Sequence, residues 1–234
     1  MLLLAFETSA KAGSVALMQE DKLLAESYQN SGLTHSQTLL SMAENMLKSC
    51  GFTPKDVTHV AVAAGPGSFT GIRIGVAAAK GFAWGSQIPC HGVSTLEAMA
   101  KNLAISDGIV VCTMDARRQQ VYNANFEACG GVLTRLCPDR AISLDELGGE
   151  LENLQKPVFL VGDGSILCYN TLKDRVEHII LPPEHRIHQR AAGVALAAME
   201  QIQQGIAGDP ATLEPNYLRL SQAERERLEK EKEK

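Results

Sequence analysis

Residues 59–85, HVAVAAGPGSFTGIRIGVAAAKGFAWG, decide the fold. They join a short apolar run, residues 60–64, to a long apolar segment through a turn that contains several glycines. The run is too short and too rich in β-branched residues for a helix, so we predict a buried parallel strand. The long segment has the length of a helix, and Ser68 or Thr70 can cap its free amides. The stretch therefore predicts a strand, a tight turn and a helix.

The predicted helix carries apolar side chains almost all the way round. At about 100° per residue its two charges, Arg73 and Lys80, lie close together on one side. A second predicted helix, residues 35–50, also has a wide apolar arc. A sheet covers one side of each helix, so we expect the surplus apolar surface to pack against a partner. The predicted interface residues are Leu39, Met42, Met46, Ile72, Arg73, Val76, Ala79 and Lys80.

Composition excludes several classes of protein. The 234 residues are 45% hydrophobic and carry a net charge of -5, which favours a globular protein and argues against one that holds nucleic acid by its own surface. No apolar run reaches the ~18 residues of a membrane span, and the apolar start lacks a basic region, so we predict a cytoplasmic protein with no membrane partner. The six cysteines contain no C-x-x-C pair, which favours reduced thiols.

The order of predicted elements indicates an α/β fold with two related mixed-sheet domains. Three strands in an antiparallel meander, then alternating helices and strands, fill residues 1–106. A new strand at residues 109–114 opens a second domain, residues 107–220, and a charged tail fills residues 221–234. In both halves the first strand runs into an acidic residue, Glu7 and Asp115, which hints at a duplicated architecture.

The turn before the helix is a candidate phosphate loop, because its glycines allow backbone amides to approach an anion. Its spacing matches neither a Walker loop nor G-x-G-x-x-G, and the alternative is that the glycines allow close packing. A carboxylate and two hydroxyls at the end of the first strand could face a phosphate or a metal-bound water, or form a hydrogen-bonded turn. The candidate vestigial nucleotide-binding residues are Glu7, Thr8, Ser9, Gly65, Gly67 and Ser68.

Spacing alone picks out no catalytic or metal-binding residue. His185 and His188 lie in a polar loop without a nearby cysteine, which favours solvated side chains over metal ligands. A weak basic patch for direct binding of a nucleic acid is a further option. Its residues are Arg117, Arg118, Arg135 and Arg140.

Three motifs resemble the YeaZ/TsaB branch of the TsaD (glycoprotease-like) family: FETS at residues 6–9, AGPGSFTGIRIG at residues 64–75 and GFA at residues 81–83. The likeness covers residues 1–105 well and the remainder loosely. It implies the actin-like ATPase (ribonuclease H-like) fold. It also implies a role in placing threonylcarbamoyl on the tRNA adenosine next to the anticodon, with TsaD as the catalytic member and the ATPase TsaE as a further partner.

One departure from the family pattern bears on mechanism. TsaD-type proteins carry a metal-binding H-x-x-x-H, and its two histidines fall here on Thr95 and Met99. Neither side chain is an adequate ligand for a hard or borderline cation, so we predict no metal site.

The resemblance then implies a non-catalytic scaffold, or pseudoenzyme, that activates TsaD as a heterodimer and also forms a homodimer. In this interpretation the chain contacts tRNA only as part of the complex and binds no cofactor of its own. ATP, if it is bound at all, binds to the complex. The alternative is an ATP-hydrolysing or peptidase enzyme that uses Glu7, the loop at residues 65–71 and Asp115.

Overall fold

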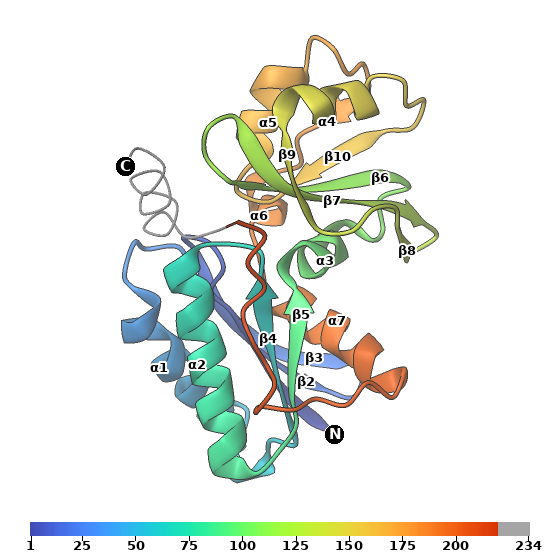
Figure 1. Cartoon of the computed structure of the whole chain (residues 1–234). Coiled ribbons are helices and arrows are strands. Elements are labelled where there is room, and N and C mark those ends of the chain that lie inside the picture. Colours follow the sequence, from blue (N-terminus) through green and yellow to red (C-terminus); the bar gives the residue numbers. More distant parts are fainter. Residues whose placement is uncertain (220–234) are drawn as a thin grey trace, which may run out of the picture.

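The computed structural model describes residues 1–219, which form two lobes, each built around one sheet (Figure 1). In the first sheet, an antiparallel meander of three strands is extended by two parallel strands, in the order β3-β2-β1-β4-β5. The predicted meander and the predicted parallel strand are confirmed. The strands are β1 (Leu2–Glu7), β2 (Gly13–Gln19), β3 (Lys22–Gln29), β4 (His59–Gly65) and β5 (Cys90–Ser94).

The second sheet repeats this topology. Its order, β8-β7-β6-β10-β11, again places a meander beside parallel strands, so the predicted duplication is confirmed. The short strands β9 and β11 were not predicted from the sequence. The strands are β6 (Gly108–Asp115), β7 (Gln120–Cys129), β8 (Val132–Arg135), β9 (Arg140–Ser143), β10 (Val158–Val161) and β11 (Ile179–Ile180).

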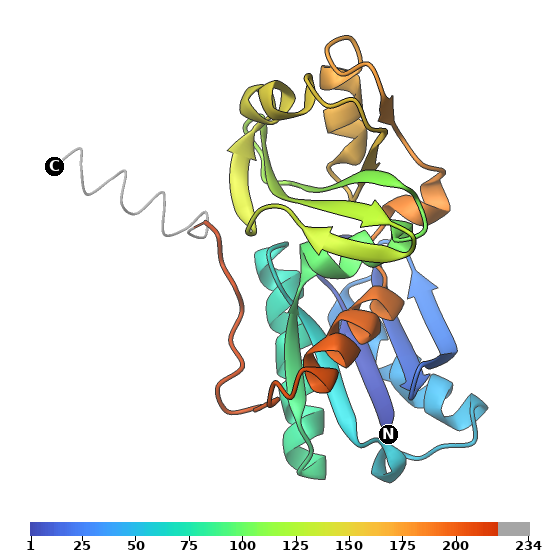
Figure 2. The same ribbon diagram turned by 90° about the vertical axis from the view of Figure 1, so that its right-hand side faces the viewer.

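Helices cover both faces of the first sheet, which explains why β1 and β4 are buried almost throughout. Helices α1 (His35–Ser49) and α2 (Phe69–Ser86) lie on one face, and α7 (Ala191–Gln203) lies on the other (Figures 1 and 2). Helix α3 (Thr95–Ala100) packs on α7 and also on the second sheet, between the lobes. Ser68 caps α2 by accepting from the Gly71 amide at 3.3 Å, as predicted.

Helix α7 departs from the predicted division of the chain. Residue 106 does separate the two sheets, but α7, predicted to lie in the domain of residues 107–220, packs on the first lobe. The Ala191 amide at its start donates to Ser14 Oγ at 2.8 Å, and Gly193 lies so close to α3 that a Cβ there would be 2.1 Å from the Ala98 carbonyl oxygen. The spacing of apolar residues such as Ala191, Val194 and Ala198 predicts a helix here, but it cannot say which sheet the helix covers.

The second lobe holds the remaining described elements. They are the helices α4 (Leu144–Leu151), α5 (Ser165–Leu172) and α6 (Glu184–Ile187). Two short 3₁₀ turns, η1 (Pro54–Asp56) and η2 (Lys101–Leu103), lie in the first half of the chain. All six cysteines are free. Within residues 1–219, no helix combines the length and the apolar character that a membrane crossing requires. The predicted tail at residues 221–234 lies outside the described residues.

After α7 the chain returns along α2 as an extended segment, residues 206–219, which we call the C-terminal strap (Figures 1 and 2). Leu213 packs on the core beneath α2. Lys80 of α2 donates to the Leu213 carbonyl at 2.9 Å, and the Asn216 amide donates to the Ala64 carbonyl at 2.7 Å. The strap therefore covers one flank of α2.

The end of the strap reaches from the first lobe to the second. Tyr217 lies against Phe69, with ring centroids 4.8 Å apart, and its hydroxyl accepts from Arg73 Nε at 2.8 Å. Arg219 then donates through Nη1 to the Ala116 carbonyl at 2.5 Å, in the turn between β6 and β7.

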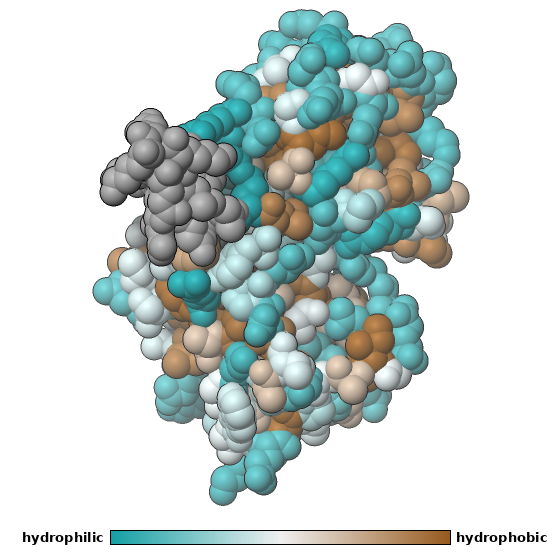
Figure 3. All heavy atoms as spheres, in the orientation of Figure 1, coloured by the Kyte–Doolittle hydropathy of each residue, from teal (hydrophilic) through white to brown (hydrophobic). Residues whose placement is uncertain are grey.

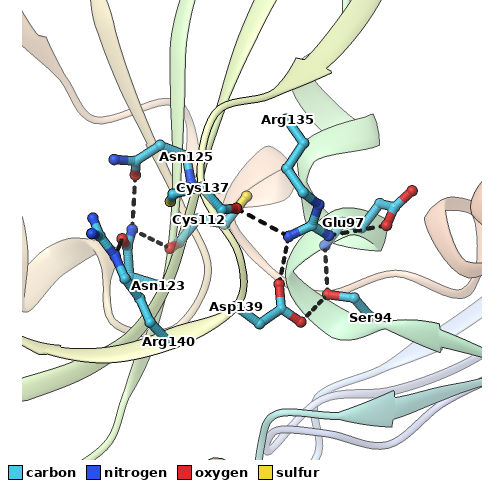
Figure 4. A network of polar contacts seen from close by, with 9 residues as sticks. All are labelled: Ser94, Glu97, Cys112, Asn123, Asn125, Arg135, Cys137, Asp139 and Arg140. Atoms are coloured by element: carbon cyan, nitrogen blue, oxygen red, sulfur yellow. Dashed lines mark hydrogen bonds and ion pairs between the residues drawn. The ribbon is translucent and has the colours of Figure 1, made fainter.

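A polar network also joins the lobes (Figure 4). Arg135 of β8 forms ion pairs with Glu97 of α3 at 3.0 Å and with Asp139 at 2.6 Å, and its guanidinium lies 4.7 Å from the centroid of the Phe126 ring. Ser94 Oγ donates to Asp139 at 2.6 Å. Because these groups come from both lobes, the network fixes α3 against the second sheet.

Candidate functional site

The glycines of the candidate phosphate loop lie against the turn that follows β1. An added Cβ at Gly67 would be 2.6 Å from the Ser9 carbonyl oxygen, and one at Gly71 would be 2.1 Å from that of Thr8. One turn later, a Cβ at Gly75 would be 2.3 Å from Thr8 Oγ1. These glycines are required because the first half of α2 packs directly on the backbone of this turn.

The chain itself uses several amides that a phosphate would need. The Ser68 amide donates to the Ser9 carbonyl at 2.7 Å, the Gly71 amide to Ser68 Oγ and the Ile72 amide to the Ser68 carbonyl at 2.8 Å. Close packing, the alternative interpretation of the loop, therefore describes it better than a phosphate cradle.

Replacing Gly71 with alanine tests this packing. The added methyl has no room beside the Thr8 carbonyl, so we expect a loss of about 2–3 kcal/mol in the free energy of unfolding, measured by urea denaturation. The matched control is Gly149→Ala in α4, where an added Cβ meets nothing within 4 Å and alanine should not destabilise the helix. Equal stabilities for the two variants would contradict the packing interpretation.

Glu7, at the end of β1, is fully buried. Its Oε1 accepts from the Ser9 amide at 2.5 Å, whereas Oε2 has no partner among the described residues. The pKa of Glu7 is raised to about 7, chiefly because burial removes water from the carboxylate. Hydrogen bonds with Ser9 oppose this rise, and the neighbouring Asp163 carboxylate adds a smaller contribution to it. Glu7 therefore shares its population between the neutral and charged forms near neutral pH.

The acid that influences Glu7 is Asp163, and not the Asp115 that sequence symmetry suggested. Asp163 follows β10, in the position that the glycine loop occupies after β4, and it accepts from Gln189 Nε2 at 3.1 Å. Its own pKa is raised, chiefly because the surrounding protein removes water. Asp115 is exposed and accepts from the Arg117 amide at 2.7 Å. The signal that could have identified Asp163 is the repeated topology.

The two positions that correspond to the TsaD-type histidines are buried in the protein interior. Thr95 and Met99 are both fully buried on α3, and the Met99 sulfur lies 3.0 Å from where a Cβ of Gly162 would stand. A lone hydroxyl and a thioether do not fit a hard or borderline cation. Across residues 1–219 no three His, Cys, Asp or Glu side chains gather as metal ligands, His185 and His188 included.

Two of the four arginines of the predicted basic patch form ion pairs within the chain, and the other two are exposed. Arg135 is held in the network between the lobes, and Arg140 pairs with Glu150, with 2.8 Å between Nη1 and Oε1. Arg117 and Arg118 remain exposed on the turn between β6 and β7.

Most of the predicted interface residues belong to the core of the chain itself. Five of the eight are buried on α1 and α2: Leu39, Met46, Ile72, Val76 and Ala79. Met42 is half-buried, and the strap engages Arg73 and Lys80. The prediction of these residues as partner contacts is therefore corrected. The sheet, both helices and the strap share one core, and that core takes up the apolar arc.

A different set of residues faces outward on α2. They recur at alternating steps of four and three residues, the spacing that brings side chains into one line between paired helices. Trp84 is 61% exposed, and Leu40 on neighbouring α1 is 57% exposed. In Figure 3 this region of the lower lobe shows neutral and hydrophobic residues interspersed with hydrophilic ones. We call these residues the α2 seam: Thr70, Ile74, Ala77, Gly81 and Trp84.

Comparison with known proteins agrees with this architecture. The family model of TsaD, tRNA N6-adenosine threonylcarbamoyltransferase, matches residues 26–227. The tRNA threonylcarbamoyladenosine biosynthesis protein TsaB of Bacillus subtilis is 33% identical over 235 residues, which cover 99% of this chain and 100% of that protein. The chain belongs to the TsaB family.

Solved structures place this TsaB family member in the actin-like ATPase fold. YeaZ from Pseudomonas aeruginosa matches with a TM-score of 0.74 and 26% identity, covering 93% of this chain and 99% of that chain. The ethanolamine utilization protein EutJ from Carboxydothermus hydrogenoformans shares the fold alone, with a TM-score of 0.51 and 13% identity over 84% of this chain and 90% of that chain. The predicted fold class, two related mixed-sheet lobes, is confirmed.

Proposed function

We propose that this chain acts in tRNA threonylcarbamoyladenosine biosynthesis as a non-catalytic subunit that pairs with TsaD. The observation that carries the proposal is the α2 seam, a line of mostly small or apolar residues that are exposed or, at Ile74, half-buried within residues 1–219. The role in biosynthesis follows from membership of the TsaB family.

The seam suits helix-to-helix packing with an equivalent helix pair. Gly81 and the neighbouring Gly85 have open space on their outer sides, so a second helix can approach the α2 backbone closely. Trp84 and Leu40 supply large apolar side chains at the margins. The family model of TsaD matches this chain, so we expect TsaD to carry an equivalent helix pair with a related surface. The same face on a second copy gives a symmetric homodimer, which competes with the TsaD heterodimer.

Two features support a non-catalytic role. Thr95 and Met99 replace the histidines that would hold the metal, and the amides at the start of α2 bond within the chain. In this proposal TsaD carries out the transfer in the cytoplasm, TsaE is a further partner, and tRNA is bound by the complex.

Purified chain mixed with purified TsaD tests the pairing. Light scattering after size-exclusion chromatography is expected to give the mass of a heterodimer, and the chain alone the mass of a homodimer. Two separate monomer peaks at micromolar concentration would contradict the proposal.

Calorimetric titration of the isolated chain with Mg-ATP distinguishes the scaffold from the alternative ATP-hydrolysing enzyme. We expect no binding heat, because Ser9 already accepts from the Ser68 amide and the glycines pack on the turn after β1. Micromolar binding of Mg-ATP would instead favour the enzyme.

A further inference from the structure

The turn between β6 and β7 holds three successive residues in left-handed backbone conformations. The φ angles are 66° at Arg117, 56° at Arg118 and 58° at Gln119. This region suits glycine and asparagine and costs other residues free energy. Glycine or asparagine would form the same turn with less strain, so the two arginines cost the chain folding free energy.

The guanidinium groups of this turn are available to a ligand. Arg117 and Arg118 are exposed, and neither forms a salt bridge within the part of the chain that the structure describes. The adjacent carboxylate, Asp115, accepts from the Arg117 backbone amide at 2.7 Å and so supports the shape of the turn. The other two arginines of the predicted patch, Arg135 and Arg140, form ion pairs within the chain.

The strap brings further arginines to this turn. Arg219 donates to the Ala116 carbonyl at 2.5 Å, and two residues earlier Tyr217 is hydrogen-bonded to Arg73 of α2. We call Arg73, Arg117, Arg118 and Arg219 the arginine ridge. The ridge spans the two lobes and begins beside Thr70, the first residue of the α2 seam, so it borders the surface proposed for the partner.

We propose that the arginine ridge contacts the phosphodiester backbone of RNA held by the complex. The planar, always charged guanidinium pairs with phosphate through two parallel hydrogen bonds, which suits recognition without base specificity. A net charge of -5 keeps the chain from binding RNA strongly alone, so the ridge adds to contacts that the partner makes. The inference rests on the proposed pairing with TsaD.

The test compares the double variant Arg117→Asn, Arg118→Asn with the wild-type chain, each in complex with TsaD. Asparagine tolerates the left-handed conformation, so the variant is expected to melt at or above the wild-type temperature. Fluorescence anisotropy with a labelled, unmodified tRNA transcript is expected to show affinity roughly tenfold weaker at low salt. The slope of log affinity against log salt is expected to fall by about 2, because two phosphate contacts are lost.

A charge-matched control removes two cations elsewhere. Lys55 precedes β4, Lys173 follows α5, both are exposed, and both lie at the sheet ends opposite the ridge. Lys55→Asn, Lys173→Asn is expected to leave tRNA affinity and salt slope near those of the wild type. Equal weakening by both double variants would overturn the inference, since only net charge would then matter.

Complex formation, measured first, separates two kinds of failure. If wild-type chain and TsaD do not associate, the proposed function fails and takes the inference with it. If all complexes form and tRNA binding is unchanged in the arginine variant, only the inference fails. If the arginine variant alone loses TsaD, the ridge is a protein contact and the RNA assignment is wrong.

Discussion

Replacing Ala77 with glutamate is expected to abolish both the homodimer and the complex with TsaD while leaving the monomer folded. Ala77 is the middle residue of the α2 seam and its side chain is exposed, so the new carboxylate is hydrated in the free chain. In either complex it would be buried without a partner, at a cost of about 3 kcal/mol or more, equivalent to more than a 100-fold loss of affinity. Size-exclusion chromatography with light scattering measures the effect.

Two further variants make the result specific. Ala141→Glu places the same charge on an exposed alanine of β9 and is expected to leave association intact. Val76→Glu, one residue from Ala77 but 4% exposed, is expected to unfold the monomer. Association of Ala77→Glu at wild-type strength would show that partners bind elsewhere.

The second large effect concerns pH and Glu7. Its pKa rises from 4.5 in the unfolded chain to about 7 in the folded one, so the folded state binds the proton more tightly. The free energy of unfolding is therefore expected to fall as pH rises from about 4.5 to 7, by about 3 kcal/mol from this group, and to level off above pH 7. Urea denaturation at a series of pH values measures this slope.

Glu7→Gln removes the titrating group and keeps the shape of the side chain. We expect the variant to lose most of this slope and to exceed the wild type in stability at pH 8, because the charged form is no longer buried. Asp163, whose pKa is also raised, contributes the remaining slope. The control is Glu20→Gln at an exposed position. Identical slopes in wild type and Glu7→Gln would mean that Glu7 is ionised in the folded state at low pH.

Local signals predicted the elements of this fold well. The meander of the first sheet, the strand before the glycine loop and the Ser68 cap all follow from local patterns in the sequence. The paired helices α1 and α2 were also correct in position. Their exposed faces were not, because periodicity measures how apolar a helix is and cannot tell which neighbour covers it.

The strap explains part of this error. Residues 206–219 have no regular secondary structure, and their sequence shows no periodic pattern. Nevertheless Leu213 packs in the core below α2, and the Lys80 ammonium donates hydrogen bonds to two carbonyls of the strap. The site shows the same division. The sequence placed Glu7 and the glycine loop together, but whether the glycines admit a ligand or a neighbouring backbone depends on distances that only the folded chain defines.

The position of α7 has a consequence for how the chain folds during its synthesis. One face of the first sheet is covered by a helix that begins at Ala191, after the whole second sheet has been translated. While the ribosome synthesises residues 107–190, this apolar face of the first sheet has no helix to cover it and is accessible to chaperones. Nascent chains arrested before α7 should consequently remain protease-sensitive in the first lobe, because one face of its sheet is still uncovered.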